Sequence, residues 1–98
     1  MSEHKISAVV TVSETKDGAN IFYNVKVFAS KDIPASVISE LQMAYRKRLW
    51  VKNIPDGVNM LHPHRFKDLS QAMKLAKQLG ENIKDCLSEF DAEVKIAV

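Results

Sequence analysis

Two histidines separated by a proline, His62 and His64, have the spacing that comes closest to a chemical site. In an extended segment, side chains two residues apart point to the same side, so two imidazoles can ligate one transition metal together. A metal site needs further ligands, however, and the third histidine, His4, lies far away near the start of the sequence. The simpler interpretation is a polar loop that Pro63 keeps extended. We therefore predict no bound metal.

The single cysteine, Cys86, is a poor candidate for a catalytic nucleophile. It lies on the apolar side of a predicted helix, close to the C-terminal end, where the helix dipole opposes a thiolate. We expect a buried core cysteine, because a catalytic thiol needs exposure and an activating base. The sequence also has no Gly-rich phosphate loop, nucleophile elbow or HExxH motif. We predict a protein that is not an enzyme, with no cofactor and no small-molecule substrate.

Basic side chains are concentrated in the middle of the sequence. Residues 45–67 contain six lysines and arginines and one acidic residue, Asp56, whereas the whole chain has a net charge of only +2. Such side chains can neutralise phosphates, and Trp50 or Tyr45 would offer a stacking surface to bases. The alternative is a solvated helix end with Trp50 turned inward on a short strand. The predicted nucleic-acid contacts are Arg46, Lys47, Arg48, Lys52, Arg65 and Lys67.

A second candidate surface belongs to two alternating segments near the start of the sequence. Phe22 and Phe28 point away from the side that the helices are expected to cover, and such a pair is more than a monomer normally exposes. Either residues 51–64 cover them as a loop, or they form a homodimer interface or a site for another protein. Met43 and Trp50 would join the solvent side of the first helix if that helix reaches residue 50. The predicted interface residues are Val9, Thr11, Phe22, Phe28, Met43 and Trp50.

The elements that position these residues follow from hydrophobic periodicity. Residues 6–12, 21–29 and 92–98 alternate apolar and polar side chains, which predicts strands, and Lys16-Asp17-Gly18 predicts a tight hairpin turn. Residues 49–54 fit either the end of a helix or a short strand, and residues 58–60 fit a further short strand. The chain is therefore predicted to have the order β-β-α-(β)-α-β.

Two segments have the three- and four-residue apolar spacing of amphipathic helices. The first begins near Asp32 or Pro34, and the second begins at Asp68 and keeps its apolar side as far as Phe90. Gly80 lies on that apolar side, which suggests that another backbone approaches closely there. The predicted fold class is α+β, a two-layer sandwich in which both helices cover one face of a mostly antiparallel sheet of three or four strands.

Length and composition place the chain among small globular proteins. Its 98 residues, 46% hydrophobic and 27% charged, suit a single domain over residues 1–98. One cysteine, no signal-like leader and no long apolar run predict a cytoplasmic protein without a membrane partner. The first functional hypothesis is a regulatory protein that acts by protein–protein binding, by analogy with small accessory proteins of bacteria and phages. The alternative is a nucleic-acid-binding module that uses the basic segment 45–67.

Overall fold

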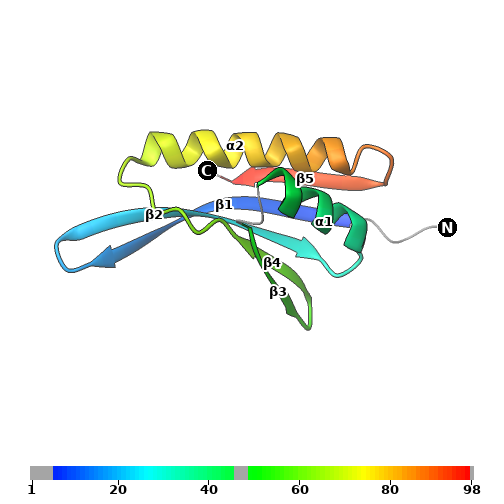
Figure 1. The fold of residues 1–98 in the computed structure, drawn as a ribbon, viewed down its shortest axis with the longest axis horizontal. Coiled ribbons are helices and arrows are strands. Elements are labelled where there is room, and N and C mark those ends of the chain that lie inside the picture. Colours follow the sequence, from blue (N-terminus) through cyan, green and yellow to red (C-terminus); the bar gives the residue numbers. More distant parts are fainter. Residues whose placement is uncertain (1–5, 46–48, 98) are drawn as a thin grey trace.

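The computed structural model describes residues 6–45 and 49–97. Within these residues the chain forms one sheet and two helices (Figure 1). In chain order the elements are β1 (Ile6–Asp17), β2 (Asn20–Ser30), α1 (Ala35–Ala44), β3 (Trp50–Ile54), β4 (Gly57–Leu61), α2 (Leu69–Cys86) and β5 (Ala92–Ala97).

The sheet has five strands in the order β3-β4-β2-β1-β5, and β5 runs parallel to β1 while every other pair is antiparallel. The predicted α+β class is confirmed, but the predicted sheet of three or four strands is too small. The difference lies in residues 50–61, which form a complete second hairpin around the turn Pro55–Asp56. Residues 49–54 and 58–60 were each predicted as a possible short strand, and both strands are confirmed, but elements of five residues are too short to predict their pairing with each other and with β2.

The β1–β2 hairpin is longer than its apolar alternation predicts. Asp17 pairs with Asn20, and the turn between them contains Gly18 with a φ of 63°, a value that favours glycine. The predicted hairpin turn is confirmed, but it lies at Gly18 and Ala19, because Lys16 and Asp17 still pair with β2. The polar end of β1 continues the ladder because backbone hydrogen bonds to β2, rather than buried side chains, hold it there.

Helix α2 provides most of the cover on one side of the sheet, where it packs against β1, β2 and β5. As predicted, Asp68 caps it, and the carboxylate accepts a hydrogen bond of 2.9 Å from the backbone N–H of Ser70. A Cβ atom at Gly80 would lie 2.5 Å from Cδ1 of Ile96, so the close neighbour is a side chain of β5 rather than a backbone. The helix ends at Cys86, and Phe90 beyond it is 43% exposed, which corrects the prediction of an apolar side that extends to Phe90.

Helix α1 lies beside α2 on the same side of the sheet, and its closest backbone approach is to α2 rather than to the strands (Figure 1). It begins directly after Pro34, close to the predicted start, and it buries Val37 and Leu41. It ends at Ala44, well before residue 50, so Trp50 belongs to a strand. The predicted helix surface shared by Met43 and Trp50 does not form.

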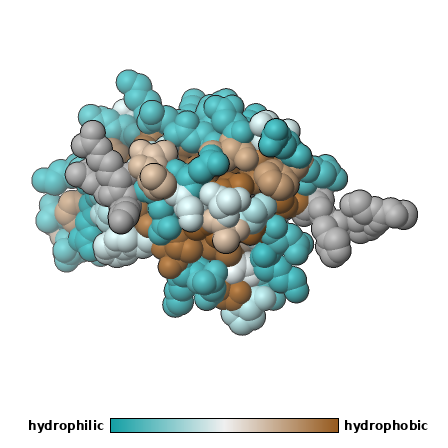
Figure 2. All heavy atoms as spheres, turned by 45° about the vertical axis from the view of Figure 1, so that its right-hand side comes forward, coloured by the Kyte–Doolittle hydropathy of each residue, from teal (hydrophilic) through white to brown (hydrophobic). Residues whose placement is uncertain are grey.

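The core is one cluster between the sheet and the two helices, with fully buried side chains from every layer, among them Val10, Val25, Met60, Leu41 and Leu79. In Figure 2, apolar side chains also reach the surface in the middle of the molecule, bordered by hydrophilic side chains. Neither helix in the described part of the chain is long and apolar enough to cross a membrane.

Candidate functional site

The side of the sheet opposite α1 and α2, called here the open face, is the candidate site. Side chains alternate between the two sides of a strand, and in β2 this places Val27 against the helices at 2% exposure and Phe28 on the open face at 41%. Residues 50–61 extend the sheet sideways by pairing with β2, so they do not form the covering loop that was one of the predicted alternatives. Phe28 therefore stays accessible to a partner.

The aromatic and basic side chains of the open face lie in two neighbouring rows of paired residues. Trp50, Leu61 and Lys26 are directly opposite one another on β3, β4 and β2, and the next row contains Lys52, Asn59 and Phe28 in the same order. Cross-strand partners on one face of a sheet are close enough for their side chains to interact. Each row therefore combines one aromatic ring with one lysine.

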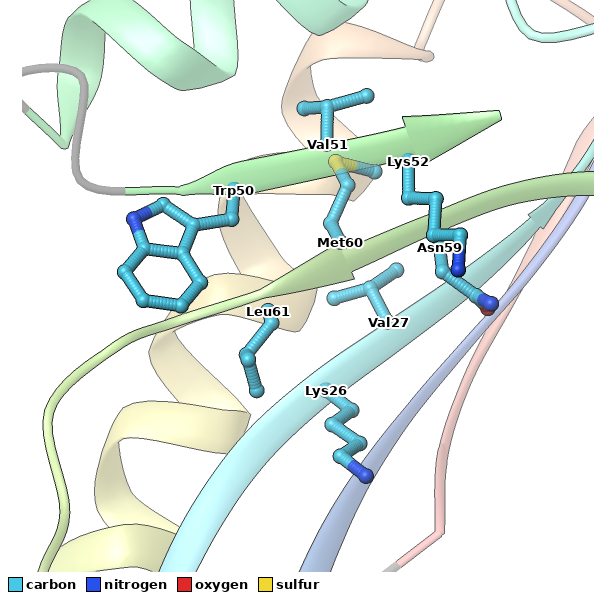
Figure 3. A pocket seen from close by; sticks show the side chains of 8 residues that line it. All are labelled: Lys26, Val27, Trp50, Val51, Lys52, Asn59, Met60 and Leu61. Carbon is cyan, nitrogen blue, oxygen red and sulfur yellow. The ribbon is translucent and has the colours of Figure 1, made fainter. Parts of the chain in front are cut away.

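All members of these rows except Phe28 line a groove of about 430 Å³, to which Val27, Val51 and Met60 also contribute. Figure 3 shows Trp50 and Lys52 projecting from β3 to one side of the sheet, while Val51 between them projects to the other side. Trp50 is 61% exposed, which is unusual for so large an aromatic side chain and leaves its ring free to contact a ligand. The groove thus has an apolar floor and ammonium groups on its margins.

The charge of the open face is mainly positive. Lys26, Lys52 and Lys95 lie on the two rows or their continuation onto β5. The acidic side chains on this face, among the strand residues that the structure describes, are Glu93 and Asp17, and they lie toward its two ends along the strand direction. The centre of the face therefore suits an anionic partner.

A further aromatic residue of the open face, Phe22, interacts with an arginine side chain. The guanidinium carbon of Arg65 lies 5.5 Å from the centre of the Phe22 ring, a cation–π arrangement. Phe22 faces Thr15 of β1, so this pair lies toward the hairpin end of the sheet, beyond the two rows.

Most of the residues singled out from the sequence meet on the open face, although they were assigned to two different hypotheses. Met43 is an exception, because it is exposed on α1 in the helix layer. Tyr45 also lies there, with its hydroxyl oxygen accepting a 2.7 Å hydrogen bond from Asn82, and it is not a stacking surface beside Trp50. Lys67 is exposed outside the strands. Arg46, Lys47 and Arg48 lie outside the described residues. The residues that do meet there are Val9, Thr11, Phe22, Phe28, Trp50, Lys52 and Arg65.

Sequence reasoning missed Lys26, Asn59, Leu61 and Lys95 on the same face. A signal for Lys26 was present, because the alternation that places Phe22 and Phe28 on one side of β2 places Lys26 there too. Asn59 and Leu61 could not be assigned to the face because the β3–β4 hairpin was not recognised as part of the sheet.

The two histidines do not act together. His62 is buried and its Nδ1 accepts a 3.3 Å hydrogen bond from the backbone N–H of His64, whereas the His64 ring packs edge-on against Phe66. This bond takes one ring nitrogen of His62 away from metal ligation. Within the described ranges, no cluster of three or more histidine, cysteine or acidic side chains has a geometry that could hold a metal ion.

Cys86 is half-buried, rather than fully buried as predicted, and it lies between the two helices. Its thiol donates a 3.5 Å hydrogen bond to the carboxylate of Glu40 on α1. Burial, together with this carboxylate, raises the pKa of the Cys86 thiol above its ordinary value. The thiol is thus held in its unreactive, protonated form, on the other side of the sheet from the open face.

Comparison with known proteins finds no matching family model, no matching curated protein and no matching solved structure.

Proposed function

We propose that the protein is a non-enzymatic binding module that holds single-stranded nucleic acid on its open face. In this proposal a base stacks on Trp50 while Lys26 and Lys52 neutralise the neighbouring phosphates. The observation that carries the proposal is the position of Trp50, which is 61% exposed at one end of the row that contains Lys26, with Lys52 two residues further along the same strand.

The two kinds of side chain on the face match the two chemical parts of a nucleotide. Aromatic rings stack on bases of any sequence, at about 1–3 kcal/mol per base, and lysines follow the phosphate backbone. A folded protein surface would provide acidic as well as basic partners, whereas the centre of the open face presents only lysines among its described charged strand residues. Charge complementarity thus favours a polyanion as the occupant.

A single strand fits better than a duplex. Bases inside a double helix are stacked on one another and do not offer their flat faces to a protein ring. Trp50 and Phe28 project from a sheet of five strands, which is broader than the α-helix or two-stranded ribbon that a major groove admits. The exposed rings are useful only to a ligand whose bases are unstacked.

Fluorescence of Trp50 tests the proposal directly, because the chain contains only one tryptophan. Titration of the protein with a thymidine homopolymer at low salt is expected to quench this fluorescence as a base stacks on the ring. With about three phosphates neutralised, the logarithm of the association constant should fall against the logarithm of salt concentration with a slope of about −2.

Variants separate the open face from the rest of the surface. Trp50→Ala and Lys26→Gln should each weaken binding, measured by anisotropy of a labelled oligonucleotide. Lys77→Gln is the matched control, since Lys77 is an exposed lysine on α2 in the helix layer. No binding by the wild type at low salt, or equal loss in the control variant, would overturn the proposal.

The rival occupant of the same face is a protein, including a second copy of this chain. Light scattering over a range of concentrations decides this question. A wild-type dimer that Phe28→Ser converts to a monomer would assign the open face to self-association, and the nucleic-acid proposal would then be wrong. A monomer that binds the oligonucleotide supports the proposal.

A further inference from the structure

We infer that Phe22 and Arg65 form a second nucleotide subsite, separate from the groove beside Trp50, which extends the ligand track onto the β1–β2 hairpin. This inference rests on the proposed function and adds to it the length of single strand that the face accommodates. The evidence is the cation–π pair of Phe22 and Arg65 and the way in which the chain positions Arg65.

The pair has the geometry of a prepared stacking platform. The Arg65 guanidinium carbon lies over the Phe22 ring, 5.5 Å from its centre, and Arg65 is exposed to solvent, so the cation remains accessible to a ligand. A guanidinium is planar, stacks on aromatic surfaces and carries several N–H donors in its plane. A base can therefore stack on the accessible guanidinium while the N–H groups donate to an adjacent phosphate.

Backbone hydrogen bonds hold Arg65 in this position. The neighbouring residue, Phe66, forms an isolated bridge with Tyr23 of β2, in which the Tyr23 N–H donates over 2.8 Å and the Phe66 N–H donates over 2.9 Å. On the other side, the carbonyl oxygen of His64 accepts a 3.2 Å hydrogen bond from the side-chain amide of Asn24. The loop between β4 and α2 is thus fastened to β2 on both sides of Arg65.

The separation of the two subsites gives the length of the ligand. Phe22 precedes Lys26 by four residues on β2, which is roughly 13 Å at the rise of an extended strand. A stacked strand rises about 3.4 Å per nucleotide and an unstacked strand advances further, so about four nucleotides or fewer span this distance. An oligonucleotide of about two nucleotides is therefore too short to reach Phe22 from the Trp50 groove, whereas one of about ten reaches both subsites.

The experiment compares these two lengths of thymidine homopolymer by anisotropy. In the wild type, the longer oligonucleotide should bind more tightly. Arg65→Ala should weaken the longer one by about ten-fold and leave the shorter one unchanged, since one stacked base and one phosphate contact are lost. Arg65→Lys should lose nearly as much, because lysine keeps the charge but lacks the flat surface.

Lys67→Ala is the matched control, as it removes a nearby exposed cation that is not stacked on a ring. Phe22→Ser should reproduce the effect of Arg65→Ala, with the unfolding midpoint checked for each variant. A longer oligonucleotide also gains affinity from its additional binding registers. The difference in affinity between the two lengths that remains in Arg65→Ala measures this gain, and only the additional difference in the wild type is assigned to the second subsite.

The outcomes separate this inference from the proposed function. If neither length binds to the wild type, the proposed function fails. If both lengths bind with dependence on Trp50 but Arg65→Ala keeps the full length effect of the wild type, the second subsite is wrong and the groove beside Trp50 stands. Equal loss in Lys67→Ala would also overturn the subsite, because it would show a general effect of charge.

Discussion

Val27 and Phe28 are neighbours in β2, but the first is 2% exposed on the helix-covered side and the second is 41% exposed on the open face. The same contrast runs across the sheet, with Val10, Val25 and Met60 buried on one side and Trp50 free on the other. The helix-covered side holds the fold together through burial of apolar surface. The open face contributes little to that burial, so its large apolar residues need a different explanation, and the proposed binding of a partner would supply one.

The contrast predicts that a truncation on the covered side costs the most stability. Leu79→Ala removes a fully buried side chain between α2 and the sheet, and it should lower the free energy of unfolding by about 2–5 kcal/mol. Urea denaturation followed by circular dichroism measures this loss. A cost below about 1 kcal/mol would show that α2 is not packed as described.

A smaller loss is expected where α2 approaches β5. Gly80→Ala places a methyl group against Ile96, and the overpacking should cost about 1–3 kcal/mol despite the better helix propensity of alanine. In the double variant Gly80→Ala/Ile96→Ala the clash is relieved, and the alanine at residue 80 should become neutral or stabilising relative to Ile96→Ala alone. If the two substitutions change the free energy of unfolding additively, Gly80 and Ile96 are not in contact.

A substitution at the start of α2 should cause the next largest loss of stability. Asp68→Ala removes the acceptor for the Ser70 N–H, and thermal or urea unfolding should show a loss of about 1 kcal/mol. Asp68→Asn keeps a capping oxygen and is expected to recover most of the stability. If both variants lose the same amount, the carboxylate acts through its charge rather than as a cap.

The open face should show the smallest effect on stability. Trp50→Ala and Lys52→Ala are expected to change the free energy of unfolding by no more than about 0.5 kcal/mol, because both side chains are exposed and away from the core. Measured in the same urea series, a loss comparable to that of Leu79→Ala would erase the difference between the two faces. Trp50 would then be a structural residue.

Long periodic segments made the fold class predictable from the sequence. Residue patterns within a single element were enough to predict four features: the β1–β2 hairpin, its glycine turn, the capped start of α2 and the final strand. The strands of the β3–β4 hairpin were predicted only as possible short strands, because β3 buries none of its five residues and β4 buries three, which is too few to distinguish a strand from a helix end. Its position beside β2 depends on contacts across the sheet, which no local pattern records.

The candidate site could be predicted only in part for the same reason. The aromatic residues of β2 and the basic residues of segment 45–67 were recognised as two separate surfaces with two separate partners. Among the described residues, Trp50 and Lys52 share one surface with the aromatic residues of β2, because β4 pairs with β2 in a register that places Asn59 beside Phe28 and Leu61 beside Lys26. The register between strands that are distant in sequence depends on tertiary contacts. That the two predicted surfaces are parts of one surface could therefore be seen only in the structure.

The pairing of β1 with β5 has a consequence for synthesis of the chain. Ile6 pairs with Ala92 and Thr11 pairs with Ala97, so one edge of β1 keeps its hydrogen-bonding groups vacant until the ribosome has made β5. A nascent chain, or a fragment that stops before Ala92, exposes this apolar edge to other chains, and unpaired edges promote aggregation. Shortened versions of the protein should therefore precipitate rather than persist as smaller folded units.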